Sequence, residues 1–206
     1  MRIDSLKPSQ RKKGRFLLTL EDGTVLRVTE EEILCFGLRE GMELEVDTLR
    51  EIQKSAKTSD TRTRAANMIS ARPLSKQELQ KRLQQKGSGE EEAAAAVEWL
   101  EDLGAVNDAE YAAILVRHYS ARGYGPLRIR EELRRRGVPR ELWDNALEER
   151  SGSGETLDAL IQKKCKGNLD DPKERKRVAD ALLRRGFSWS EVRAALGRYT
   201  EILEDD

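Results

Sequence analysis

The residues best suited to chemistry in this sequence are arginines, which concentrate in the stretch RIREELRRRG, Arg128–Gly137. The stretch holds five arginines in ten residues and ends at a glycine. Guanidinium groups bind phosphates and carboxylates through paired, charge-assisted hydrogen bonds. The stretch therefore indicates a surface for a phosphate backbone or an acidic protein groove. The plainer interpretation is a solvated helix face, because Glu131 and Glu132 offer neighbouring ion pairs.

Catalytic chemistry finds little support in the sequence. The single histidine, His118, has no Cys, Ser or paired carboxylate in a recognisable motif, so we expect it on the surface or in helix packing. The acidic run Glu90–Glu92 falls at a helix start, where capping explains it better than metal binding. GYGP, Gly123–Pro126, lacks the phosphate-loop pattern, and Pro126 lacks an amide that such a loop uses. We expect no enzyme, cofactor or metal site.

Composition predicts a thin core under a heavily charged surface. Of 206 residues, 37% are hydrophobic and 37% are charged, and only three Phe, four Tyr and three Trp are available for packing. The 38 basic and 38 acidic side chains cancel, so no global field draws the molecule to DNA or to an anionic membrane. An extended arrangement of repeated helices suits such a chain better than one thick core.

Cysteine usage and hydropathy indicate a soluble protein of a reducing compartment. Cys35 and Cys165 match neither a metal-ligand spacing nor a disulfide framework, and we expect Cys35 to be a buried core residue. No run approaches the roughly 20 apolar residues that a membrane span requires, and the first residues lack the apolar segment of a signal peptide. We therefore expect a cytoplasmic monomer with no membrane partner.

The elements that position the arginines form an internal repeat. Three segments align on glycines 50 and 49 residues apart: SKQELQKRLQQKG ending at Gly87, GPLRIREELRRRG ending at Gly137, and ERKRVADALLRRG ending at Gly186. Each predicts a helix that stops at its glycine. Apolar pairs recur eight and four positions before the glycines, at Leu79 and Leu83, Ile129 and Leu133, and Val178 and Leu182. A second pair follows six and ten positions after them, at Ala93 and Val97, Trp143 and Leu147, and Val192 and Leu196.

Each repeat is predicted to be a three-helix module, because a helical pattern also precedes each aligned segment. The fold class is mainly α: an elongated array of three modules behind a small β-containing domain. We predict the N-terminal domain at residues 1–47, a helical linker at 48–61, and the modules at 62–105, 106–150 and 155–200. The sequence SGSG at 151–154 indicates a flexible link before the third module.

The N-terminal domain is predicted from a hairpin and a capping box. Phe16–Leu20 and Val25–Val28 carry β-type residues around a D-G turn at Gly23. Thr29 with Glu32 predicts the start of a short helix. A helix from Thr48, followed by the polar stretch KTSDTRTR, is expected to join this domain to the first module.

A helical wheel places basic residues opposite the apolar pairs of modules two and three. Recurrence at the same repeat position raises the probability that they bind a partner. The candidate binding residues, which include an exposed aromatic in the GYGP turn, are Lys81, Tyr124, Arg128, Arg135, Lys176, Arg177 and Arg184. Packing of the turn is an equal alternative for Tyr124. Trp99, Trp143 and Trp189 could stack on bases, but we expect them in the core.

The run RGYGPLRIREELRRRGVPRELWDNAL, Arg122–Leu147, resembles the central module of the RecX family of regulatory proteins. SKQELQKRL in the first module and LLRRGFSWSEV in the third resemble the family less closely. Residues 1–47 lie outside the family's core, and the resemblance covers roughly residues 62–200.

The resemblance implies a modulator of the bacterial RecA recombinase. Such a protein binds the RecA filament on single-stranded DNA and inhibits filament extension, recombinase and ATPase activity and the coprotease activity of the SOS response. It has no cofactor or catalytic group. The alternative is an autonomous single-stranded DNA- or RNA-binding helical repeat protein, in which the arginines contact phosphates directly.

Overall fold

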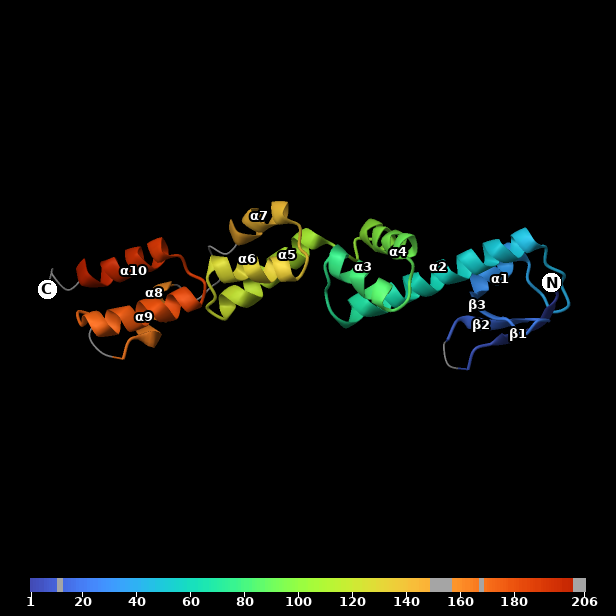
Figure 1. Cartoon of the computed structure of the whole chain (residues 1–206), viewed down its shortest axis with the longest axis horizontal. Helices are drawn as coiled ribbons and strands as arrows, with labels where there is room; N and C mark the ends of the chain where they lie inside the picture. Colours follow the sequence, from blue (N-terminus) through green and yellow to red (C-terminus); the bar gives the residue numbers. More distant parts are fainter. Residues whose placement is uncertain (11–12, 149–156, 167–168, 202–206) are drawn as a thin grey trace. The chain divides into compact units, whose positions relative to one another are not determined.

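The computed structural model describes residues 1–10, 13–148, 157–166 and 169–201 of the chain. It is mainly helical, with one three-stranded antiparallel sheet at the N-terminus (Figure 1). The predicted class, three-helix modules behind a small β-containing domain, is confirmed. The chain divides into two compact units, one comprising Met1–Arg72 with Leu79–Val106 and the other Pro73–Glu78 with Asn107–Asp206.

The sheet is built around the predicted hairpin. Strand β2, Arg15–Leu20, pairs with β3, Val25–Thr29, and the turn between them has Gly23 at φ 81°. The opposite edge of β2 pairs with β1, Ile3–Pro8, a strand that the sequence analysis did not predict. Polar residues and a terminal proline suit an edge strand, and they also weaken its sequence signal.

Helix α1, Glu30–Phe36, begins with the predicted capping box, in which Thr29 and Glu32 bond reciprocally. Ile33 and Phe36 face the sheet core, whereas Leu34 is 76% exposed. Cys35 is also exposed, so its prediction as a buried core residue is wrong. A short helix turns only one narrow face to the core, and positions 34 and 35 lie on the other side.

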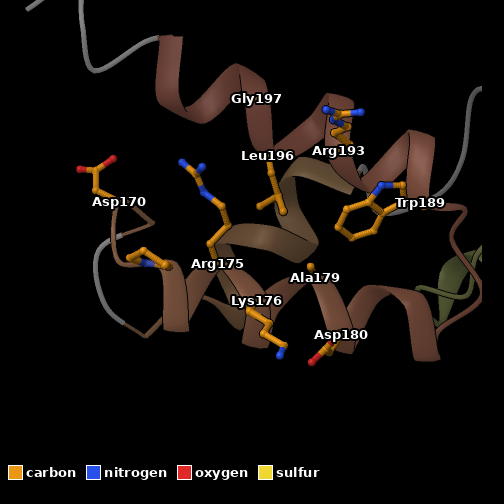
Figure 2. A pocket seen from close by; sticks show the side chains of 10 residues that line it. Asp170, Arg175, Lys176, Ala179, Asp180, Trp189, Arg193, Leu196 and Gly197 are labelled. Atoms are coloured by element: carbon orange, nitrogen blue, oxygen red, sulfur yellow. The ribbon is translucent and has the colours of Figure 1, made fainter.

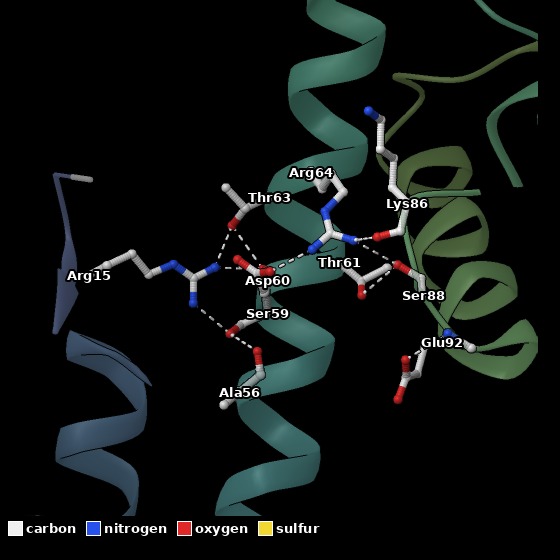
Figure 3. Close-up of polar contacts among 11 residues, drawn as sticks. Arg15, Ala56, Ser59, Asp60, Thr61, Thr63, Arg64, Lys86, Ser88 and Glu92 are labelled. Carbon is white, nitrogen blue, oxygen red and sulfur yellow. Dashed lines mark hydrogen bonds and ion pairs between the residues drawn. The ribbon is translucent and has the colours of Figure 1, made fainter. Parts of the chain in front are cut away.

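Helix α2, Val46–Ala71, runs through the first unit. It is longer than expected, because the polar stretch KTSDTRTR continues the helix instead of following it. Buried Arg15 on β2 donates to Ser59 Oγ and to the Ser59 carbonyl at 2.8 Å each, and to Thr63 Oγ1 at 2.7 Å (Figure 3). These polar contacts add to the apolar packing of Ile52 and Ala56 in the sheet core, and they lie where α2 has no apolar periodicity.

The other side of α2 contacts the turn at residues 86–88. Arg64 pairs with Asp60 at 2.8 Å and donates to the Lys86 carbonyl at 2.9 Å (Figure 3). Thr61 and Ser88, both buried, lie 3.2 Å apart through their hydroxyl oxygens. The helix therefore serves both the sheet domain and the first module.

Three helix groups form the modules. Module one comprises the last turns of α2 with α3, Lys76–Gln85, and α4, Glu90–Asp102. Module two comprises α5, Asp108–Ala121, α6, Pro126–Arg135, the 3-10 helix η1, Arg140–Leu142, and α7, Trp143–Glu148. Module three comprises α8, Leu157–Lys164, α9, Pro172–Arg184, and α10, Trp189–Glu201. The SGSG sequence lies outside the described residues.

The repeated apolar pairs form the module cores. All six residues of the first set, Leu79, Leu83, Ile129, Leu133, Val178 and Leu182, are 0% exposed. In the second set Trp143 and Leu147 are only half-buried, because α7 is short and follows a 3-10 turn. The three repeat glycines have φ of 88°, 69° and 85°, as the predicted helix stops require.

None of the described helices is long and apolar enough to cross a membrane.

Candidate binding surface of the helical modules

The arginines of α6 are organised around one buried carboxylate, Glu132, whose side chain is 6% exposed. Arg135 donates to Glu132 Oε2 from Nη2 at 2.6 Å and from Nε at 3.1 Å. Tyr119 Oη donates to the same oxygen at 3.0 Å, and Arg128 Nη2 lies 3.5 Å from Oε1. Glu132 therefore holds two arginines that remain 64% and 43% exposed.

The charge of Glu132 is stabilised by this surrounding. Burial, the largest single effect, raises the pKa of the carboxyl group, but the hydrogen bonds from Arg135 and Tyr119 and the nearby positive charges together outweigh it. The positive charges of Arg135 and Arg128 act in the same direction. The pKa of Glu132 consequently lies below its ordinary value of 4.5.

The corresponding arginine of module three, Arg177, is also held in place. It donates to both carboxylate oxygens of Glu174 and, at 2.6 Å, to the carbonyl of Lys164. The hydrogen bonds that Arg177 donates to Glu174 raise the pKa of Arg177 above its ordinary value. Three of the predicted binding arginines are thus preorganised by acidic neighbours.

The remaining predicted cations are more available. Lys81, Lys176 and Arg184 are exposed, and they form no ion pair with any residue that the structure describes. Lys81 belongs to the first unit, while Lys176 and Arg184 lie on α9 of the second. The sequence could not separate held arginines from free ones, because both kinds occupy the same helix face.

The junction of modules two and three brings Arg128 against the turn that follows Arg184. The amides of Gly125 and Leu127 donate to the carbonyls of Arg185 and Gly186 at 2.8 and 3.0 Å. A Cβ on Gly186 would lie 2.5 Å from Cβ of Arg128. The N-terminus of α6 therefore abuts the turn that ends α9, two residues after Arg184.

A similar contact occurs within the second unit, at the residues that precede α3. Ser75, which aligns with Gly125, donates its hydroxyl to the carbonyl of Arg136 at 2.5 Å. The same oxygen accepts the amide of Glu78 at 3.1 Å, as a helix cap. In both contacts, the carbonyl before the repeat glycine is bonded by the residue that opens the second helix of the preceding module.

Tyr124 lies at the junction of modules two and three and is half-buried. Its ring packs edge-on against Tyr119, with centroids 5.8 Å apart, and the Arg185 guanidinium lies 5.9 Å from its centre. This position favours the turn-packing alternative over a freely exposed contact. Its role as a binding residue stays a prediction.

The three tryptophans differ in exposure. Trp99 is half-buried beneath the Arg62 guanidinium at 5.2 Å, and Trp143 donates Nε1 to the carbonyl of Val138 at 3.0 Å. Trp189 is 59% exposed, so its prediction as a core residue is wrong. Its position, three residues before buried Val192, suited a core residue, but Phe187 fills the core at the start of α10 instead.

Two residues of the candidate surface were not singled out from the sequence: Glu132, which was named only as a source of ion pairs, and Trp189, which was expected in the core. Glu132 follows Arg128 by four positions and precedes Arg135 by three, so helical spacing carried a signal for the cluster. Trp189 gave no such signal, because a tryptophan beside an apolar stripe usually packs inward.

These features define a helical repeat protein with charged helix faces. Three descriptions of one family match it in order: "RecX, first three-helix domain" at residues 62–100, the second at 107–147, and the third at 154–196. The chain belongs to the RecX family of regulatory proteins.

Individual relatives support this assignment. The chain is 36% identical over 134 residues to "Regulatory protein RecX" of Xanthomonas campestris pv. campestris (strain B100), covering 64% of this chain and 83% of the relative. The Pseudomonas putida protein of that name is 34% identical over 128 residues, covering 61% and 82%.

Solved structures share the fold. One described as "Crystal structure of regulatory protein RecX" matches with a TM-score of 0.70 at 23% identity, covering 100% of this chain and 99% of its own. RecX from Lactobacillus salivarius matches with a TM-score of 0.60 at 20% identity, covering 70% and 97%.

Proposed function

We propose that this protein regulates RecA by binding its nucleoprotein filament on single-stranded DNA. Binding limits filament extension and the recombinase, ATPase and coprotease activities, and it thereby modulates DNA repair and the SOS response. The protein acts as a cytoplasmic monomer without a catalytic step of its own. Membership of a family of regulatory proteins supports a role in protein control.

The observation that carries the proposal is the set of cations at the junction of modules two and three. Glu132 holds Arg128 and Arg135 in fixed positions, and Arg184, two residues before the turn that meets Arg128, adds a charge with no ion pair among the described residues. Preorganised guanidinium groups lose little side-chain entropy when they bind a carboxylate or a phosphate. Because the whole chain is neutral, such a local surface can meet an acidic protein face and a phosphate chain together.

The test is RecA ATP hydrolysis on single-stranded DNA. Substoichiometric wild-type protein should inhibit hydrolysis. The variant Lys81→Glu/Arg184→Glu should need an about tenfold higher concentration for the same inhibition. These two cations have no ion pair among the described residues, so their reversal leaves the fold intact. Arg50→Glu, on the exposed start of α2, is the matched control and should inhibit like wild type. No effect of wild type would overturn the proposal.

The exposure of Trp189 favours a second candidate, an autonomous single-stranded DNA- or RNA-binding protein. This function predicts tight binding of free oligonucleotides, with affinity that falls steeply as salt rises. Fluorescence titration of oligothymidylate over a salt series separates the two functions. Weak binding of free DNA beside strong binding of RecA filaments favours the regulator.

A further inference from the structure

Module three contains an open groove between α9 and α10. The cavity has a volume of about 620 Å³, and its non-polar lining is Pro172, Ala179, Trp189, Leu196 and Gly197. Figure 2 shows Trp189, Leu196 and Arg175 directed toward the space between the two helices. Lys176 and Asp180 lie at the edge formed by α9. The groove thus combines an exposed indole with an apolar floor and charged edges.

The positive charges of the groove exceed the negative ones. The lining contains three basic residues, Arg175, Lys176 and Arg193, and two acidic residues, Asp170 and Asp180. Arg175 uses its Nε on the carbonyl of Leu169 at 3.2 Å. Lys176 and Arg193 are exposed and form no ion pair in the part of the chain that the structure describes. Two cations are therefore available to an incoming anion beside an apolar surface.

The equivalent groove of module two is crossed by an ion pair. Arg130 on α6 bonds Asp144 on α7 at 2.9 Å. The 49-residue repeat places Ala179 and Arg193 at these positions in module three. The long side chain has become a methyl group and the acidic partner has become basic, so module three cannot form the bridge. Its groove is open where that of module two is crossed.

In module two, the face around this ion pair is bordered by a segment of the following module. The residues around it, Pro126, Leu127 and Arg130 among them, share a cavity with Ser188 and Glu191 at the start of α10. A polypeptide segment of the following module therefore lies beside this face. In module three, the described lining comes only from α9, α10 and Asp170. The repeat thus identifies the groove as a position for a protein segment.

We propose that the module-three groove docks an acidic peptide segment of a partner protein, with an apolar side chain at its centre. The apolar side chain packs on Trp189, Ala179 and Leu196. Carboxylates on either side of it pair with Arg193 and Lys176. Charge complementarity and the apolar floor select this occupant over a basic segment. The proposal goes beyond RecA regulation and does not depend on which protein supplies the segment.

The experiment uses the exposed indole as the reporter. Full-length protein labelled with 5-fluorotryptophan gives one ¹⁹F resonance for each of its three tryptophans, and Trp189→Phe assigns that of Trp189. The probe is a short synthetic peptide in which glutamates flank a pair of leucines. Titration should shift the Trp189 resonance and leave those of Trp99 and Trp143 in place. The same peptide with lysines for glutamates should cause no shift.

Variants of the groove test the assignment. Arg193→Glu should weaken peptide binding at least about tenfold. Ala179→Arg/Arg193→Asp restores the ion pair of module two and should abolish the shift. Arg184→Glu, on the same helix but outside the groove, is the matched control and should bind like wild type. Helical circular dichroism should be equal in all variants.

Three outcomes would overturn the proposal. One is no shift of Trp189 with the acidic peptide. Another is an equal shift with the lysine peptide, because charge would then not select the ligand. The third is a shift with oligothymidylate and none with the acidic peptide, which would assign the groove to nucleic acid.

Discussion

Glu132 shows how one acidic side chain determines the use of several basic ones. Its neighbours Arg128 and Arg135 read as free cations on a helical wheel, yet both are held by the same buried carboxylate. Charge reversal at Arg135 would place two carboxylates together beside the core. Such a variant would lose folding and binding together, and the residues without ion pairs are better probes of binding.

At the residue scale we predict that Glu132→Gln destabilises the protein and flattens its acid response. The pKa of Glu132 is lowered in the folded state, so its contribution is fully present above the ordinary value of 4.5 and is lost as pH falls through the lower folded pKa. At neutral pH the loss should be about 1–2 kcal/mol. Urea unfolding at neutral and acidic pH measures both effects.

Glu131 provides the matched control. It bonds Arg128 at 2.6 Å but is 51% exposed. Glu131→Gln should change the unfolding free energy by less than about 0.5 kcal/mol. Equal losses in the two variants would mean that Glu132 has no special part in holding the arginines.

The residues of the candidate site were only partly predictable. Spacing identified Arg128, Arg135 and Arg177 as members of one repeated face, but the accepting carboxylates are set by rotamers that the sequence does not specify. Trp189 was assigned to the core from its position beside an apolar face, and Cys35 from its residue type, but both are exposed. Tertiary contacts, which decide the side of a helix that is covered, overrode those preferences.

At the scale of elements, the glycines where α6 begins and α9 ends differ from Gly197 within α10 in the space available for a side chain. A Cβ on Gly125 would overlap the backbone of Gly186 and Phe187, whereas one on Gly197 would meet nothing within 4 Å. The first glycine is required by a close approach of two main chains. The second only lowers the helical propensity of α10.

We therefore predict opposite effects of two identical substitutions. Gly125→Ala should separate the main chains of the junction and destabilise the second unit. Gly197→Ala should stabilise α10 by about 0.5–1 kcal/mol, the usual difference between Gly and Ala in a helix. Thermal unfolding followed by circular dichroism distinguishes the two results. A Gly125→Ala protein as stable as wild type would show that the junction tolerates a side chain.

The second helix of each module could be predicted because it carries an apolar pair and a glycine stop. Helix α2 was predicted only in part, because Ser59, Thr61 and Thr63 make its contacts through hydroxyl groups. A helix segment that packs through polar residues has a sequence that resembles that of a loop. Strand β1 was missed for a related reason, since an edge strand needs little apolar sequence.

At the scale of the whole molecule, the N-terminal sheet and the first module share one unit through α2. Arg15 is 5% exposed and makes three hydrogen bonds to that helix. Arg15→Ala would leave the hydroxyl and the main-chain carbonyl of Ser59 without their charged donor. The variant should lose about 1–3 kcal/mol from the first unit.

Amide hydrogen-exchange rates, measured in both units in one experiment, test this prediction. Amides of β2 and α2 should exchange faster in Arg15→Ala, while those of α6 and α9 should keep their wild-type rates. Equal acceleration in both units would mean that they unfold as one cooperative body. Unchanged exchange in β2 would mean that Arg15 does not hold the sheet.

The junction of modules two and three is made by main-chain atoms, since the amides of Gly125 and Leu127 bond the carbonyls of Arg185 and Gly186. Main-chain atoms are the same whatever side chains surround them. A segment of the gene that encodes one module could therefore be duplicated in tandem and still yield a matching joint, provided that its two glycines were copied. Outward-facing residues of each copy would then be free to diverge toward different ligands without altering the joint.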